Sequence, residues 1–172
     1  MRVILAHMAQ DASRRATPAA RHVVSVEGSS DESLYARVGT LLGLKSGIHS
    51  EVDLIEQLEK GLAPSAVQTL RTRIGLTDDE MFHLIAPRRT LSRREASGQS
   101  LSRDEADKAV RIARIAARAQ QVFGGKPDYA ALWLREPKMA LGDRTPMQAL
   151  STESGARAVE ELLIGIEHGL FN

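Results

Sequence analysis

The side chains best suited to chemistry in this sequence are arginines gathered in one short stretch. Residues 86–94, with the sequence APRRTLSRR, hold four arginines and no acidic residue. A guanidinium can grip a phosphate or bind the O6 and N7 atoms of guanine together, so the stretch is suited to DNA. The alternative is a solvated basic helix face that docks an acidic partner, and the pattern alone favours neither. The candidate DNA-binding residues are Arg88, Arg89, Thr90, Arg93 and Arg94.

The residues around this stretch predict a helix-turn-helix. Thr77-Asp78-Asp79-Glu80 is a capping box that opens a short helix over residues 77–84. Ala86-Pro87 breaks the run, and residues 88–97 are helical again before Gly98. Two short helices joined in this way have the dimensions of a motif whose second helix presents its N-terminal residues to the major groove. The turn holds Pro87 where many such motifs place a glycine.

No comparable pattern supports catalysis or metal binding. The chain has no cysteine, which excludes disulfides, thiolate zinc sites and cysteine nucleophiles. Glu80-x-x-His83 matches one carboxylate–histidine step of a di-iron bundle, but the second step that such a site needs is missing. Gly124-Gly125-Lys126 lacks the first glycine of a phosphate-binding loop, and no GxSxG elbow is present. We therefore expect no catalytic residue, no metal ligand and no cofactor.

The elements that would position the arginines are predicted to be helices, and the fold class is all-α. Helical periodicity begins at Leu34, and serine, threonine, proline and glycine mark most helix ends. Ser50, Ser102 and Thr145 are predicted N-caps, each with Asp, Glu or Gln three residues later. The predicted core-facing positions of the other helices are Val52, Ile55 and Leu58; Val67, Leu70 and Ile74; Ala109, Ile112, Ala113, Ala116, Ala119 and Phe123; Tyr129, Leu132 and Trp133; and Val159, Leu162, Leu163 and Ile166.

Three regions are predicted along the chain. Residues 1–33 are a leader, with one strand-like run (HVVSV, 22–26) and a polar break (EGSSDE, 27–32). Residues 34–100 form a helical region that contains the helix-turn-helix, and residues 101–172 form a C-terminal domain. No apolar run approaches the roughly 20 residues that span a bilayer, and the N-terminal apolar run is too short for the core of a signal peptide. We expect a cytoplasmic protein with no membrane contact.

The net charge of +1 conceals a strong segregation of charge. The arginines of residues 86–94 are followed, in residues 151–172, by four glutamates and a single arginine. Near-neutrality therefore excludes only a uniformly basic nucleic-acid binder. The chain also ends on Leu170-Phe171, directly after a predicted helix stop at Gly169. An apolar pair at a terminus is usually exposed, but it could also enter a partner's pocket.

Four motifs in the same order carry a resemblance to a known family. They are RTLSRR (89–94), LSRDEADKAVRIARIAARAQQVFG (101–124), WLREPKMALGDRTP (133–146) and GARAVEELLIGIEHGLF (155–171). This pattern, over roughly residues 50–172, resembles the Xre/MbcA/ParS antitoxins of RES–Xre toxin–antitoxin pairs. The resemblance implies a helix-turn-helix that binds promoter DNA of its own operon, and a C-terminal toxin-binding domain. It implies homodimers, larger toxin–antitoxin assemblies, and a RES-domain toxin that degrades NAD⁺ as partner.

Carried over by motif position, the resemblance places the toxin-binding residues in the C-terminal third. For Trp133 alone, a core anchor between two short helices is the favoured alternative. We expect an antitoxin that covers its toxin's active-site entrance and represses its own operon; the alternative is a stand-alone helix-turn-helix regulator whose C-terminal domain only dimerises. The expected toxin-binding residues are Trp133, Arg135, Glu167, His168, Gly169, Leu170 and Phe171.

Overall fold

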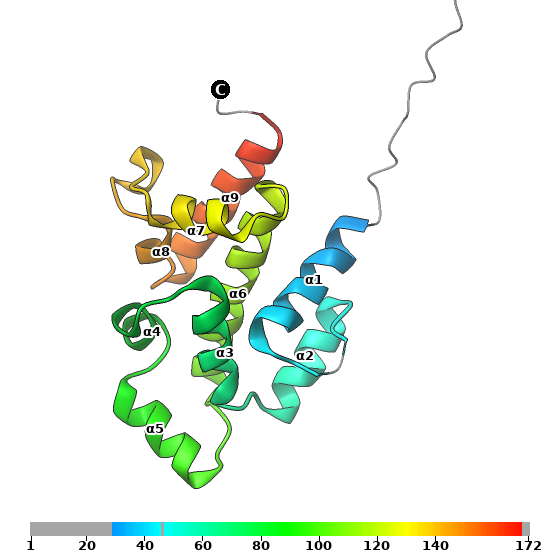
Figure 1. Cartoon of the computed structure of the whole chain (residues 1–172), viewed down its shortest axis with the longest axis vertical. Coiled ribbons are helices and arrows are strands. Elements are labelled where there is room, and N and C mark those ends of the chain that lie inside the picture. Colours follow the sequence, from blue (N-terminus) through cyan, green and yellow to red (C-terminus); the bar gives the residue numbers. More distant parts are fainter. Residues whose placement is uncertain (1–28, 46, 170–172) are drawn as a thin grey trace, which may run out of the picture.

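Every regular element in the described part of the chain is a helix, which confirms the all-α class. The computed structural model describes residues 29–45 and 47–169 (Figure 1). None of the helices in these ranges is both long and apolar enough to cross a bilayer. The elements are α1 (Ser29–Leu42), α2 (Glu51–Lys60), α3 (Ser65–Ile74), α4 (Asp78–Leu84), α5 (Arg88–Ser97), α6 (Arg103–Val122), α7 (Pro127–Arg135), the 3-10 helix η1 (Met139–Leu141), α8 (Pro146–Ala149) and α9 (Glu153–Glu167).

Helix α6 is the element around which the others pack. It runs through the middle of the molecule, with α1 on one side and α9 on the other, and it also contacts α3 and α7 (Figure 1). Its predicted face, including Ala109, Ile112 and Ala113, is buried, while Phe123 packs at the edge of the core. Val110 and Ile115 are buried as well, because α6 is covered from more than one direction. The many alanines let neighbouring helices approach it closely.

The predicted helix starts are confirmed at all four capping boxes. In each box the side-chain oxygen of the capping residue accepts a hydrogen bond from the backbone amide three residues later. The side chain of that later residue accepts one from the backbone amide of the capping residue. The capping residues are Ser50, Thr77, Ser102 and Thr145. In the first box, the backbone amides of His49 and Ser50 both donate to Asp53 Oδ2 at 2.9 Å. Hydrogen bonding to the charged form, led by the amide of His49, lowers the pKa of the Asp53 carboxyl.

Two predicted core stripes are right in one residue each, Leu58 on α2 and Trp133 on α7, and wrong in the others. On α2, Val52 and Ile55 are 62% and 51% exposed, and the buried residue is Leu54. On α7, Tyr129 and Leu132 are also exposed, and the helix buries the residues Ala130 and Leu134 instead. Both helices are short and have apolar residues on two overlapping faces. Their neighbours decide which face is buried, and periodicity within the helix cannot.

The boundary of the predicted leader is also wrong in its last residues. Residues 29–33 belong to α1, so the run that looks like a polar break is partly the first turn of a helix. The strand-like run 22–26 lies outside the described residues, as do Leu170 and Phe171.

Candidate functional site

Helices α4 and α5 follow one another at one edge of the molecule (Figure 1). Met81 and Leu84 of α4 and Leu91 of α5 are buried and hold the pair to the core. The three residues between the helices adopt no left-handed conformation, and Pro87 has a φ of −57°. A glycine is needed in a turn mainly where φ is positive. The turn therefore forms without the glycine that many such motifs contain.

Three of the predicted DNA-binding arginines are exposed on α5. Arg88, Arg89 and Arg93 present their side chains to solvent, and Thr90 is half-buried beside them. They lie from the first turn of the helix onward, where a recognition helix meets base edges. This surface, formed by Arg88, Arg89, Thr90 and Arg93, is called the α5 basic face below.

Arg94 is placed differently from the other four. Its Nε atom lies 2.7 Å from Oε2 of Glu105, and its Nη1 donates to the carbonyl oxygen of Ser100 at 3.1 Å. Both side chains of the ion pair are largely buried, at 18% and 10% exposed. Because Glu105 also completes the cap of Ser102, Arg94 joins α5 to the start of α6. The predicted set of DNA-binding residues thus contains three exposed arginines and one that is held internally.

In the C-terminal half, Trp133 is half-buried and packs against the core. Its ring centroid lies 5.9 Å from that of Phe123, at the end of α6. The ammonium nitrogen of Lys138 lies 5.2 Å from the Trp133 ring centroid on an outer side. The residue is therefore an anchor between α6 and α7.

Arg135, at the end of α7, reaches across to the helix-turn-helix. Its Nη2 donates to the carbonyl oxygen of Gly75 at 2.6 Å and lies 3.3 Å from Oε2 of Glu80. Glu80 is the residue that reaches back in the capping box of α4. Sequence reasoning placed Arg135 at a toxin surface and missed this contact, which joins residues 55 positions apart.

The end of α9 combines one internal ion pair with an exposed tip. Glu167 lies 2.7 Å from Nη2 of Arg118 on α6. His168 and Gly169 are exposed, and Gly169 has the left-handed φ of 68° expected of a helix stop. Among the predicted residues described here, Glu167 is thus paired with α6, whereas His168 and Gly169 are exposed at the end of α9.

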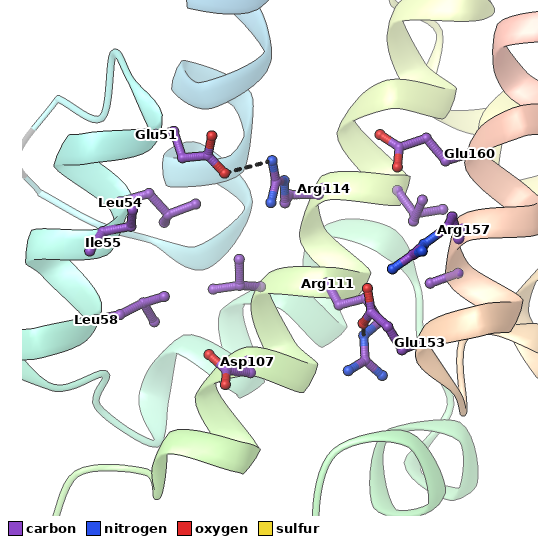
Figure 2. Close-up of a pocket in the computed structure, with 13 residues that line it drawn as sticks. Glu51, Leu54, Ile55, Leu58, Asp107, Arg111, Arg114, Glu153, Arg157 and Glu160 are labelled. Carbon is purple, nitrogen blue, oxygen red and sulfur yellow. Dashed lines mark hydrogen bonds and ion pairs between the residues drawn. The ribbon is translucent and has the colours of Figure 1, made fainter.

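A cleft of about 390 Å³ lies between α2, α6 and α9 (Figure 2). Arg114 of α6 is 3.3 Å from Glu51 of α2, and Arg111 is 3.0 Å from Glu153 of α9. These ion pairs tie α6 to both neighbours. No group of three potential metal ligands occurs in residues 29–45 and 47–169. Glu80 is already engaged, so its spacing to His83 reflects a helix cap and not a ligand pair.

Comparisons with known proteins match both halves of the chain. Residues 53–114 match the antitoxin Xre-like helix-turn-helix domain, and residues 118–169 match the antitoxin Xre/MbcA/ParS C-terminal toxin-binding domain. The α5 basic face lies in the first range, and Trp133, Arg135 and the end of α9 lie in the second.

Several curated proteins are similar over most of the chain. Antitoxin Xre of Pseudomonas putida is 37% identical over 134 residues, which are 78% of this chain and 82% of that protein. Antitoxin Xre of Yersinia enterocolitica is 28% identical over 69% of this chain and 81% of its own length. A Sphingobium protein named Prs ADP-ribosylating antitoxin is 26% identical over 71% of this chain and 82% of its own length. The chain therefore belongs to the Xre antitoxin family, with a helix-turn-helix domain followed by a toxin-binding domain.

Proposed function

We propose that this antitoxin neutralises a RES-domain toxin that degrades NAD⁺, by covering the entrance to its active site. The observation that carries the proposal is the open end of the toxin-binding domain, where His168 and Gly169 are exposed beyond the last packed turn of α9. The carboxylates of Glu160 and Glu161 are exposed on the same helix. A cleft that binds the pyrophosphate of NAD⁺ needs basic groups, which an acidic helix attracts. The name of the Sphingobium relative also refers to ADP-ribosylation, a reaction that consumes NAD⁺.

The test is to delete residues 169–172, which leaves the buried Leu163 and the Glu167–Arg118 ion pair in place. We expect the truncated protein to lose protection of NAD⁺ when it is mixed with the toxin, while its thermal unfolding stays as in the full chain. Glu153→Gln is the matched control, because it weakens another ion pair between α9 and α6 but keeps the end of α9. If the truncated chain still protects NAD⁺, the entrance is covered by another part of the domain.

We also propose that the antitoxin represses its own operon, and that it binds as a homodimer with one α5 basic face in each half-site. Three exposed arginines in the first two turns of α5, a helix that Leu91 and Arg94 fix to the core, support this proposal. Arg89→Ala combined with Arg93→Ala should weaken promoter binding. Loss of two phosphate contacts should also flatten the slope of log K against log salt by about 2.

The salt slope is measured by fluorescence anisotropy on labelled promoter DNA. Arg157→Ala is the matched control, since Arg157 is an exposed arginine on α9. An unchanged slope in the double variant would show that α5 does not contact the phosphates.

A further inference from the structure

The toxin-binding half exposes large apolar side chains that its own fold does not use. Tyr129 and Leu132 on α7 are 58% and 64% exposed, and Met139 in η1 is 89% exposed. Tyr129 and Leu132 are three residues apart on one helix and therefore share a face. Helix α7 is attached to the core through Ala130 and Leu134, on its other side. Met139 directly follows Lys138, whose ammonium nitrogen lies 5.2 Å from the ring centroid of Trp133 on α7. The three exposed residues Tyr129, Leu132 and Met139 are together called the α7–η1 apolar face.

Charged residues near this face are largely engaged within the chain. Arg135 binds Gly75 and Glu80, and the ammonium group of Lys138 lies 2.9 Å from the carboxylate of Glu136. The ammonium of Lys126 lies 5.1 Å from the ring centroid of Tyr129. A partner that covers this region would therefore meet exposed apolar side chains whose neighbouring charges are largely paired within the chain. Such a composition is typical of the anchoring part of a protein interface, where aromatic residues carry much of the binding energy.

We propose that the α7–η1 apolar face is the surface by which the antitoxin holds its toxin, separately from the end of α9 that covers the active-site entrance. The proposal rests on the proposed function, because it takes the RES-domain toxin as the occupant. The whole face lies within residues 118–169, which match a toxin-binding domain. The toxin should therefore offer an apolar patch to this face. The α7–η1 apolar face would then determine the affinity for the toxin, and the end of α9 would determine its inhibition.

The test compares two substitutions at equally exposed positions. Leu132→Glu places a charge in the centre of the α7–η1 apolar face, and Val52→Glu places the same charge on α2, where the residue is 62% exposed. Binding is measured by calorimetry with a catalytically inactive variant of a RES-domain protein from the same genome. We expect Leu132→Glu to raise Kd at least tenfold and Val52→Glu to change it less than twofold. Both variants should unfold at the temperature of the unaltered chain, since surface substitutions have small effects on stability.

Tyr129→Ala and Met139→Ser extend the test without adding charge, and Kd should rise in both. Deletion of residues 169–172 should leave the affinity for the toxin unchanged but abolish its inhibition. The substitutions on the α7–η1 apolar face should instead lower the affinity. Unaltered affinity in Leu132→Glu, Tyr129→Ala and Met139→Ser would overturn the assignment of the face. An equal loss of affinity in Val52→Glu would show that the effect of Leu132→Glu is not specific to the α7–η1 apolar face. Failure of the unaltered chain to bind the RES-domain protein would overturn the proposed function itself, a result distinct from either.

Discussion

Glu105 is the single buried charged residue in the part of the chain that the structure describes, at 7% exposed. Its carboxylate accepts from the backbone amide of Ser102 at 2.8 Å and pairs with Arg94 at 2.7 Å. One side chain thus starts α6 and fixes the orientation of α5. A buried ion pair contributes little by itself, but removing one partner leaves an uncompensated charge.

Glu105→Ala should therefore lower the free energy of unfolding by about 3 kcal/mol. The causes are loss of the carboxylate that accepts from the Ser102 amide, and a largely buried Arg94 guanidinium left without its carboxylate. Urea unfolding followed by circular dichroism measures the change. Glu105→Gln is the control, because it keeps an acceptor for Ser102 and removes only the charge, so its loss should be smaller. A stability of Glu105→Ala within about 0.5 kcal/mol of the unaltered chain would contradict this role.

At the residue scale, the sequence predicts well those interactions that join residues close together in the chain. The cap at Ser102 joins residues three positions apart, and its chemistry is visible in the sequence. The pairing of Arg94 with Glu105 depends on how the chain turns between two helices. Arginines at 88, 89, 93 and 94 are therefore alike in sequence and differ only once the helices are packed.

At the scale of elements, Arg135 is the contact that ties α7 to the start of α4. Arg135→Ala removes its hydrogen bonds to Gly75 and Glu80, so we expect a loss of about 1–2 kcal/mol in the free energy of unfolding. Hydrogen exchange should rise in the first turn of α4, because Glu80 loses the charge that steadies it. Exchange measured by mass spectrometry on the full chain reports this directly.

The control for Arg135 is Arg157→Ala, whose side chain is exposed on α9. If exchange in α4 stays unchanged in Arg135→Ala, the contact between the halves does not depend on this guanidinium. If Arg135→Ala lowers the affinity for the toxin and leaves hydrogen exchange in α4 unchanged, Arg135 contacts the toxin, as the sequence resemblance implies.

Helix existence and helix ends were within reach of the sequence, and helix orientation was not. α2 begins directly after its predicted cap Ser50, yet α2 and α7 each bury residues other than most of those predicted. The predicted face of α2 joins Leu58 to Val52 and Ile55, and the buried face joins Leu58 to Leu54. Nothing local distinguishes these two faces. The error on α7 matters more, since it hid the residues of the α7–η1 apolar face.

At the scale of the whole molecule, α6 serves both halves of the chain. One continuous core includes Val38 of α1, Ile112 of α6 and Val159 of α9. Residues 101–172 were predicted from the sequence as a separate domain, and we now expect this piece to fold poorly alone. Without α1 and α3, the side of α6 that packs on them would face water.

Isolated residues 101–172 should therefore lack a cooperative thermal transition. Trp133, the sole tryptophan of the chain, reports on this through its fluorescence, which should indicate a more solvated ring than in the full chain. Residues 29–172 are the control and should unfold as the full chain does. A sharp transition in the isolated piece, with unaltered tryptophan emission, would show that the C-terminal half is independent.

The shared position of α6 also limits how members of this family could exchange toxin specificity. The two matched ranges meet inside α6, between residues 114 and 118. A recombination event there would join half of one central helix to half of another, and the alanines that let α1 and α9 approach would no longer be matched to their neighbours. A viable chimaera would need to inherit α1, α6 and α9 from one parent. New specificity for a toxin should therefore arise more readily through substitutions on the exposed side of α7 than through exchange of whole domains.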